Sequence, residues 1–256
     1  MTVRIAVAGK GGTGKTTFAA LAIRHLTGLG QGPVLAVDAD PNSNLHEALG
    51  LEARETIAGL LEETKQTGPL PAGMSRTSFI QYRLQSALVE AKGVDLLVMG
   101  TPEGAGCYCY PNSLLRDHLA GLTANYAYLV VDNEAGLEHL SRRIAQEIDI
   151  LFVLSDASVR GIRTAGRVRG LVADLGLNVA AMYLVLTRAG AREAGALATE
   201  IAGTGLPLLG TVPLDPAVSQ HDLSGLPMTA LPAGSPAVTA VADILARAGQ
   251  VGARKE

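Results

Sequence analysis

The chain contains no tryptophan, and aromatic residues make up only 4% of its 256 residues. Hydrophobic residues nevertheless amount to 48%, and most of them are Ala, Val, Leu and Ile. This content excludes an intrinsically disordered chain, which has low hydrophobicity and high net charge. Small aliphatic side chains suit parallel strands that are covered by helices on both faces. The length is sufficient for one large α/β domain or two small ones.

Strong charge, long apolar runs and a cysteine framework are also missing. The formal net charge is −3, so the composition does not favour nucleic acid or an anionic membrane as a partner. No apolar run approaches the ~20 residues of a transmembrane helix, and the first residues do not form a secretory signal. Two cysteines are too few for a disulfide framework and indicate a reducing compartment. We therefore expect a cytoplasmic protein.

Short β-branched segments alternate with helical patterns along the chain. Strands are expected at 3–8, 34–37, 94–99, 128–131, 150–154, 182–186 and 208–212. Helices are expected at 15–29 and near 112–122, 137–147, 159–176, 191–203 and 236–249. This alternation predicts an α/β fold: one domain with a mostly parallel β-sheet and helices on both faces. The less regular stretch at about 52–93 is interpreted as an insertion into that domain.

Residues with functional potential follow the predicted strands at the points where the strands end. Right-handed crossovers bring the carboxyl ends of parallel strands to one edge of the sheet. We therefore expect one functional edge, formed by Gly9, Asp38, Thr101, Asp132, Ser155 and Thr187.

Residues 9–16 read Gly-Lys-Gly-Gly-Thr-Gly-Lys-Thr and fit the phosphate-loop pattern G-x-x-x-x-G-K-[ST] between a strand and a helix. Glycines let the loop turn its N–H groups onto an anion, and the helix N-terminus adds partial positive charge. Lys15 is expected to reach the β- and γ-phosphates, and the Thr16 hydroxyl to bind Mg²⁺. The pattern predicts a P-loop ATPase whose nucleotide site includes Gly11, Gly12, Thr13, Gly14, Lys15, Thr16 and Thr17.

A second lysine, Lys10, precedes these glycines. With it, residues 10–17 read K-G-G-T-G-K-T-T and resemble the variant loop of the MinD/ParA/nitrogenase-iron-protein (SIMIBI) family of P-loop ATPases. The resemblance implies ATP, ADP and Mg²⁺ as ligands and a homodimer favoured by ATP. It also implies that Lys10 is catalytic, because in that family this lysine reaches the partner's nucleotide phosphate. A solvated loop lysine is the other interpretation.

Three carboxylates follow strands near the phosphate loop. Asp38-Ala39-Asp40-Pro41 resembles the first switch segment of the family. The resemblance implies that Asp38 lies near Mg²⁺ through a bound water and that Asp40 aligns the attacking water. A turn that caps the next helix is the alternative for Asp40. Asp132 ends an apolar strand, as in a Walker B element, and is expected on the magnesium side.

Other positions follow the family pattern less closely. Gly136 resembles the glycine of the second switch, whereas Glu134 stands where relatives carry a small residue. Thr187 occupies the position of an adenine-reading asparagine, and a hydroxyl cannot donate and accept in the bidentate way of an amide. Pro213 resembles the family proline that packs beside the base. ATP is therefore favoured through the resemblance.

Cys107 and Cys109 form a Cys-x-Cys motif ahead of Pro111, which suits the first residue of a helix. Thiolates are favoured just before a helix and bind Zn²⁺, Cu(I), Ni²⁺ or iron–sulfur clusters. A closed metal site usually has four ligands, which two such pairs on a twofold axis would supply. Buried small hydrophobes, a strained disulfide and chance proximity remain open.

The Cys-x-Cys motif, Asn112-Ser113 and the segment Ala135-Gly136-Leu137-Glu138-His139-Leu140 resemble the CooC-type subfamily of nickel-insertion accessory ATPases. That resemblance implies Ni²⁺ at Cys107 and Cys109, shared across the dimer, although the spacing equally permits Zn²⁺. It also implies a client metalloenzyme, carbon monoxide dehydrogenase. His139 is a further candidate ligand. A positioning ATPase of the MinD/ParA type and an electron-transfer ATPase bridged by an iron–sulfur cluster are the alternatives.

Overall fold

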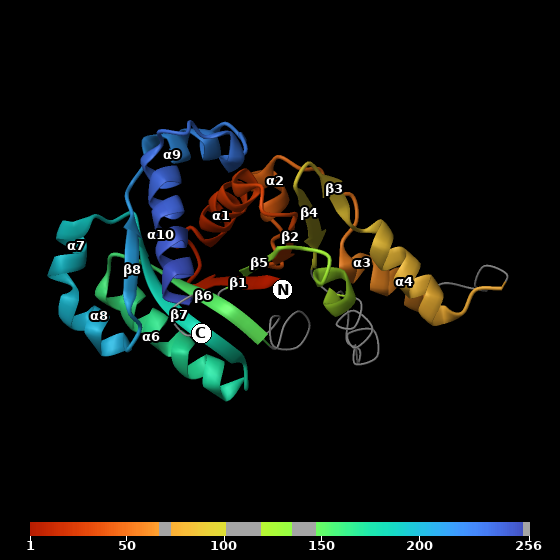
Figure 1. The fold of residues 1–256 in the computed structure, drawn as a ribbon, viewed down its shortest axis with the longest axis horizontal. Coiled ribbons are helices and arrows are strands. Elements are labelled where there is room, and N and C mark those ends of the chain that lie inside the picture. Colours follow the sequence, from red (N-terminus) through yellow and green to blue (C-terminus); the bar gives the residue numbers. More distant parts are fainter. Residues whose placement is uncertain (67–72, 101–118, 135–146, 253–256) are drawn as a thin grey trace.

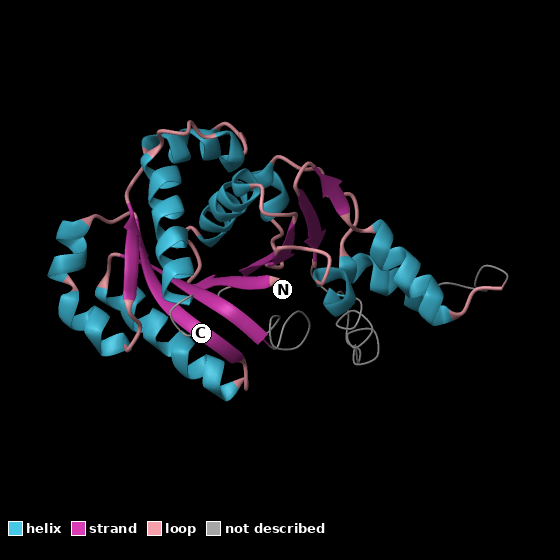
Figure 2. Ribbon diagram, viewed as in Figure 1, coloured by secondary structure: helices cyan, strands magenta, loops and turns pink. Residues whose placement is uncertain are grey.

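The computed structural model describes residues 1–66, 73–100, 119–134 and 147–252 (Figures 1 and 2). Its centre is an eight-stranded sheet with the strand order β3-β4-β2-β5-β1-β6-β7-β8. Every neighbouring pair is parallel except β3 and β4 at one edge. The strands are β1 (Val3–Gly9), β2 (Val34–Ala39), β3 (Val89–Ala91), β4 (Val94–Val98), β5 (Tyr128–Asn133), β6 (Glu147–Asp156), β7 (Asn178–Thr187) and β8 (Leu208–Val212).

Helices cover both faces of this sheet, as Figure 2 shows. They are α1 (Lys15–Leu29), α2 (Leu45–Leu49), α3 (Ile57–Gln66), α4 (Arg76–Ser86), α6 (Val159–Asp174), α7 (Ala191–Ala196), α8 (Ala198–Thr204), α9 (Pro216–Leu223) and α10 (Pro236–Gly252). The predicted fold class, a mostly parallel sheet between two layers of helices, is confirmed. Of the helices expected near 112–122 and 137–147, the first lies partly and the second almost wholly outside the described residues.

The two helical layers follow from the alternation of side chains along each strand. In β1, Ile5 and Val7 pack into the core that contains α1 and α10, whereas Ala6 and Ala8 pack into the core that contains α6. All four side chains are buried, so β1 is covered on both faces and lies in the interior of the sheet. The phosphate loop therefore leaves the sheet from a rigid central strand.

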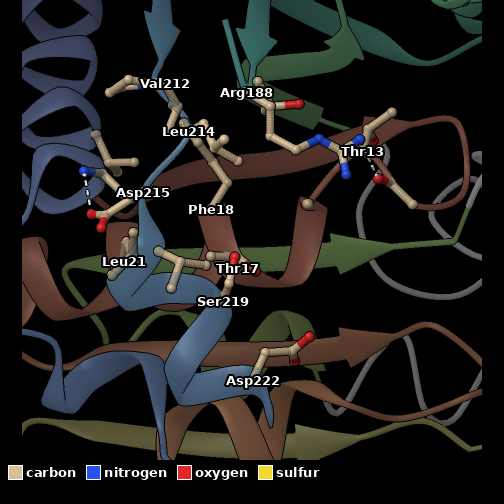
Figure 3. Close-up of a pocket in the computed structure, with 17 residues that line it drawn as sticks. Thr13, Thr17, Phe18, Leu21, Arg188, Val212, Leu214, Asp215, Ser219 and Asp222 are labelled. Atoms are coloured by element: carbon tan, nitrogen blue, oxygen red, sulfur yellow. Dashed lines mark hydrogen bonds between the residues drawn. The ribbon is translucent and has the colours of Figure 1, made fainter.

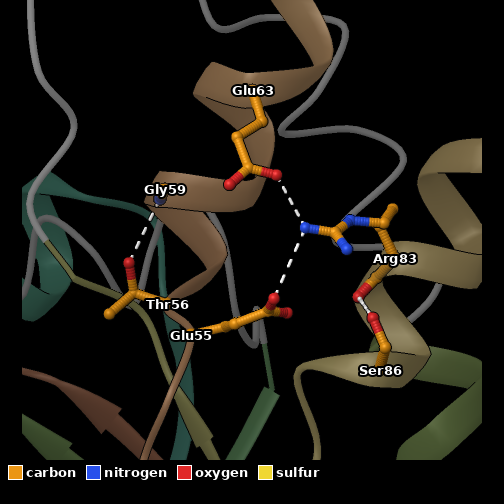
Figure 4. Close-up of polar contacts among 6 residues, drawn as sticks. All are labelled: Glu55, Thr56, Gly59, Glu63, Arg83 and Ser86. Carbon is orange, nitrogen blue, oxygen red and sulfur yellow. Dashed lines mark hydrogen bonds and ion pairs between the residues drawn. The ribbon is translucent and has the colours of Figure 1, made fainter.

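Residues 52–93 contain more regular structure than their sequence indicated. They form α3, α4 and the edge strand β3, and Figure 1 shows α3 and α4 at the end of the molecule opposite α7 and α8. Arg83 ties this region together, since its Nη2 donates to Glu63 at 2.6 Å and to Glu55 at 3.5 Å (Figure 4). These contacts join α4 to α3 and to the segment before it.

One glycine is required where β1 turns into the phosphate loop. Gly9 has φ of 148°, and a Cβ there would lie 2.3 Å from the Leu154 carbonyl oxygen of β6. A real Cβ does not approach backbone oxygen so closely, so the neighbouring strand excludes every side chain at this position.

None of the helices in the described parts of the chain has the length and apolarity needed to cross a membrane.

Candidate functional site

The carboxyl ends of the parallel strands bring the predicted residues to one edge of the sheet. Asp38 of β2 is in register with Asp132 of β5, and Asp132 is in register with Val7 of β1. Gly9 pairs with Leu154 of β6 on the other side. Sheet order therefore places the two aspartates beside the start of the phosphate loop, although they are far apart in the sequence.

The phosphate loop connects β1 to α1 through three exposed glycines and two buried polar residues. Gly12 and Gly14 have φ of 76° and 81°, in the left-handed region that glycine adopts without strain. Thr13 closes the loop on itself, since its hydroxyl donates to the Lys10 carbonyl at 2.8 Å. Lys15 is only 7% exposed. The loop thus ends in a buried lysine at the residue where α1 begins.

Two buried carboxylates lie near the phosphate loop, and one of them, Asp132, is close enough to interact with the Lys15 charge. Asp132 is 1% exposed, and its pKa is raised to about 7, chiefly by burial and also by the Asp38 charge, against the lowering effects of the Thr16 hydroxyl and the Lys15 ammonium. Burial likewise raises the pKa of Asp38 to about 6, against hydrogen bonds from the N–H groups of Leu45 and Asp40. Such shifts are frequent at functional sites. Each carboxylate lacks a full countercharge, which a bound cation would supply.

The residues fit a magnesium ion. Both carboxylate oxygens of Asp132 are buried and have no hydrogen-bond partner among the described residues. The Thr16 hydroxyl is near enough to lower the Asp132 pKa, but the pair does not meet hydrogen-bond geometry. Oxygen ligands of this kind, with waters, are what Mg²⁺ prefers. The set of donors is therefore suited to the divalent ion that accompanies a nucleotide.

The segment after β2 is held by Asp38. Its Oδ1 accepts from the Asp40 N–H at 3.2 Å and its Oδ2 from the Leu45 N–H at 2.8 Å. Asp40 in turn closes a small turn, since its Oδ1 accepts from both the N–H and the side-chain amide of Asn42, each at 2.9 Å. The Asp40 carboxylate is half-buried at the edge of the site. In this arrangement Asp40 forms a turn with Asn42, but the N–H of Leu45 at the start of α2 is bound by Asp38 and not by Asp40.

A cavity of about 330 Å³ opens on the other side of the phosphate loop (Figure 3). Gly12, Gly14 and Thr17 form one wall, and the lining also includes Thr187 at the end of β7 and Pro213 just after β8. Thr187 is 6% exposed, and its hydroxyl donates to the Ser155 carbonyl at 3.2 Å. Its donor is therefore already used within the sheet, which leaves the Thr187 oxygen only as an acceptor toward a ligand.

Sequence reasoning missed the structural role of Asp215 beside this cavity. Its Oδ1 accepts from the Ala217 N–H and caps α9, while its Oδ2 accepts from the Ser235 hydroxyl and the Ala237 N–H at the start of α10. One buried carboxylate therefore joins two helix N-termini. Asp followed by Pro216 is the local signal for the first cap, but the link to Ser235 is visible only in the fold.

Replacing Asp215 with alanine is expected to destabilise the fold by about 2 kcal/mol at pH 7, because a buried acceptor of several hydrogen bonds is lost. Burial raises the Asp215 pKa, but the hydrogen bonds from Ser235, Ala237 and Ala217 outweigh it and bring the pKa below its ordinary value of 3.8. The carboxylate thus stabilises the fold above about pH 4, and this contribution is lost as the pH falls through the folded-state pKa.

Urea denaturation of the parent and Asp215→Ala proteins at several pH values measures this effect. The gap between the two free energies of unfolding is expected to be full at pH 7 and to narrow below about pH 4. Asp174→Ala, at the exposed C-terminal end of α6, serves as the matched control. A gap that is absent at pH 7, or that widens in acid, would show that Asp215 does not cap these helices.

Several predicted residues lie outside the described part of the chain. These are Thr101, Cys107, Cys109, Gly136 and His139. Within the described residues, no group of three or more His, Cys, Asp and Glu side chains is arranged to hold a metal ion. Glu134 is described and exposed at the end of β5.

Comparisons with known proteins show which proteins this chain resembles. The family described as "CobQ/CobB/MinD/ParA nucleotide binding domain" matches residues 5–228. An uncharacterized ATP-binding protein of Methanocaldococcus jannaschii is 40% identical over 243 residues, which cover 94% of this chain and 96% of that protein. The carbon monoxide dehydrogenase accessory protein CooC of Rhodospirillum rubrum is 33% identical over 237 residues, 88% of each chain.

Solved structures show the same fold. The septum site-determining protein MinD of Pyrococcus horikoshii, solved in complex with Mg-ADP, superposes with a TM-score of 0.70 at 22% identity. The match covers 98% of this chain and 96% of that one. The sheet and its helical layers are therefore shared along nearly the whole length of both proteins.

Proposed function

Since the chain belongs to the CobQ/CobB/MinD/ParA nucleotide-binding family and is a P-loop ATPase, we propose that it is a metallochaperone. It would use ATP hydrolysis to assist nickel insertion during maturation of a client metalloenzyme, carbon monoxide dehydrogenase. The observation that carries this proposal is the 33% identity with CooC over 88% of both chains. Cys107 and Cys109 support it, because nothing in ATP hydrolysis requires a pair of thiols.

At the nucleotide, each part of the site has a distinct role. The loop N–H groups and Lys15 would bind the phosphates, and Thr16 and Asp132 would hold Mg²⁺, with Asp38 reaching it through a water. When bound, Mg²⁺ neutralises charge that develops on the phosphate oxygens. Asp40 would orient the attacking water from the edge of the site. The base would lie in the cavity between Pro213 and Thr187.

Lys10 is suited to act on a second subunit. The residue is exposed, and its side-chain ammonium makes no hydrogen bond or ion pair with the residues that the structure describes, although its carbonyl accepts from Thr13. It stands at the mouth of the phosphate loop, five residues before Lys15. In an ATP-favoured homodimer this free cation would reach the partner's nucleotide, so that hydrolysis would depend on assembly.

The backbone supports a link between the nucleotide and the cysteines. The Met99 N–H, just after β4, donates to the Asp38 carbonyl at 2.8 Å, and the Met99 carbonyl accepts from the Ala58 N–H at 2.9 Å. The chain therefore runs toward Cys107 from a point that is bonded to the magnesium-side aspartate. A change at Asp38 on nucleotide binding would act directly on the start of the cysteine-bearing segment. Coupling of this kind is reciprocal between the two ligands.

Metal titration tests the proposal. We expect one Ni²⁺ or Zn²⁺ per dimer, bound by four thiolates without sulfide, because each chain supplies two ligands. The metal affinity is expected to differ between the ADP state and a state with a non-hydrolysable ATP analogue. Inductively coupled plasma analysis and competition titration measure the two quantities, with Cys107→Ser and Cys109→Ser as the variants that should abolish binding.

The alternatives give other results. One metal per monomer, or binding that survives both serine substitutions, would refute the shared thiolate site. Acid-labile sulfide in protein purified anaerobically would indicate an iron–sulfur-bridged ATPase instead. As a control for non-specific binding of metal to an exposed thiol, Ser86→Cys adds a thiol on the exposed part of α4 and should leave the metal stoichiometry unchanged.

A further inference from the structure

The loop after β7 contains an arginine in an uncommon backbone conformation. Arg188 has φ of 53° and Ser43 has φ of 52°, and among the described residues no other non-glycine residue has a positive φ. The left-handed region is unfavourable for a residue with a Cβ. Such a residue persists where the surrounding contacts hold it, and it is frequently associated with a ligand site. The contacts of Arg188 therefore identify what this conformation achieves.

Both neighbours of Arg188 are fixed to adjacent strands. The Thr187 hydroxyl donates to the Ser155 carbonyl of β6, and the Ala189 N–H donates to the Val212 carbonyl of β8 at 3.1 Å. The left-handed turn between these two anchors directs the Arg188 side chain across the cavity. Figure 3 shows its guanidinium beside Thr13 of the phosphate loop. There Nη2 donates to the Gly12 carbonyl at 2.9 Å, between residues 176 positions apart.

We infer that Arg188 is a positioning residue that holds the phosphate loop in its binding conformation. The Gly12 carbonyl and the Thr13 N–H belong to one planar peptide unit, so a guanidinium that fixes the carbonyl also fixes the direction of that N–H. Glycines have no side chain with which to restrain the loop, and the Thr13 hydroxyl bonds only within the loop. Arg188 supplies a long-range restraint from a different part of the sheet.

The Arg188 side chain also lines the proposed nucleotide cavity, so the residue that restrains the phosphate loop borders the ligand site itself. Its positive charge also lies on the phosphate side of that cavity, where it favours an anion. This role concerns nucleotide binding alone and is independent of any metal cargo. It assigns a function to a residue that the phosphate-loop pattern does not contain.

Arg188→Gly tests the inference, because glycine accepts the left-handed conformation and removes the tether without adding strain. We expect the Kd for ATP to rise about tenfold, as for the loss of a hydrogen bond to a charged group, while the melting temperature stays equal or increases. Arg188→Lys keeps the charge but has no fork of donors, so an intermediate Kd is expected. Arg192→Ala, an exposed arginine of α7, should bind ATP as the parent does.

Isothermal titration with ATP and with inorganic tripolyphosphate separates the possible outcomes. If Arg188 positions the phosphate loop, Arg188→Gly weakens both ligands by a similar factor. Weakening of ATP alone would place Arg188 on the base rather than on the loop and would overturn the inference. An unchanged ATP Kd, or a Kd change matched by a fall in melting temperature, would overturn it as well.

Discussion

Lys15→Ala is expected to abolish ATP hydrolysis, lowering kcat by at least about 10²–10³-fold, because a fixed cation at the transferred phosphoryl group stabilises the transition state. Lys15 is buried, with 7% of the residue exposed, and a buried charge acts more strongly than one in water. Nucleotide binding should weaken too, because the same group pairs with the ground-state phosphates.

Steady-state hydrolysis and ATP titration measure the two effects. Lys92→Ala is the matched control, since Lys92 is exposed in the turn between β3 and β4, at the edge of the sheet away from the phosphate loop. That variant should hydrolyse ATP at the parent rate. Hydrolysis by Lys15→Ala within a few-fold of the parent would contradict the assignment of the phosphate lysine.

Asp40→Ala, unlike Lys15→Ala, is expected to slow ATP hydrolysis while ATP binding is nearly unchanged. The kcat should fall by about 10²–10³-fold, in the range for loss of a group that orients or deprotonates the attacking water. The Kd for ATP should change little, because Asp40 stands outside the phosphate loop and bonds to Asn42 rather than to Lys15 or Thr16. Single-turnover hydrolysis and ATP titration together measure this separation.

Asp40→Asn distinguishes a chemical role from a structural one. Its amide oxygen can still accept from the Asn42 N–H and so preserve the turn after β2. If Asp40 acts as a carboxylate, the asparagine variant is as slow as the alanine variant. If the turn alone matters, asparagine restores activity. Hydrolysis at the parent rate by Asp40→Ala would remove Asp40 from the mechanism altogether.

These two substitutions divide the site into functional parts. Lys15 lies inside the phosphate loop, whereas Asp40 lies on a segment that Asp38 holds through the N–H groups of Asp40 and Leu45. Binding of Mg²⁺ and nucleotide beside Asp38 would therefore act on the segment that carries Asp40. The loop and the segment after β2 are the places where binding and turnover can be altered separately.

The fold and the phosphate loop were readable from the residues because their signals are local. The helix at 15–29 and the strand at 208–212 coincide with α1 and β8. Apolar periodicity and the fixed spacing of glycines and Lys15 are properties of contiguous chain, so they need no knowledge of the fold. The common edge for Asp38 and Asp132 also followed, since parallel strands place their carboxyl ends together.

Features that depend on distant partners were not readable in this way. The strand β3 has three residues, and its pairing with β4 makes it a strand. The helix α4 is mostly polar, and the contacts of Arg83 join it to α3 and to the segment before α3.

Asp215 and Arg188 show the same limit within the site. Each acts through a group that is remote in sequence, Ser235 for the first and Gly12 for the second. The residues adjacent in sequence influence the backbone conformation of a residue. The distant hydrogen-bond partner of its side chain depends instead on which strands lie side by side. In this chain β1 lies between β5 and β6, with β7 and β8 beyond, and that order places the turn of Arg188 within reach of the phosphate loop.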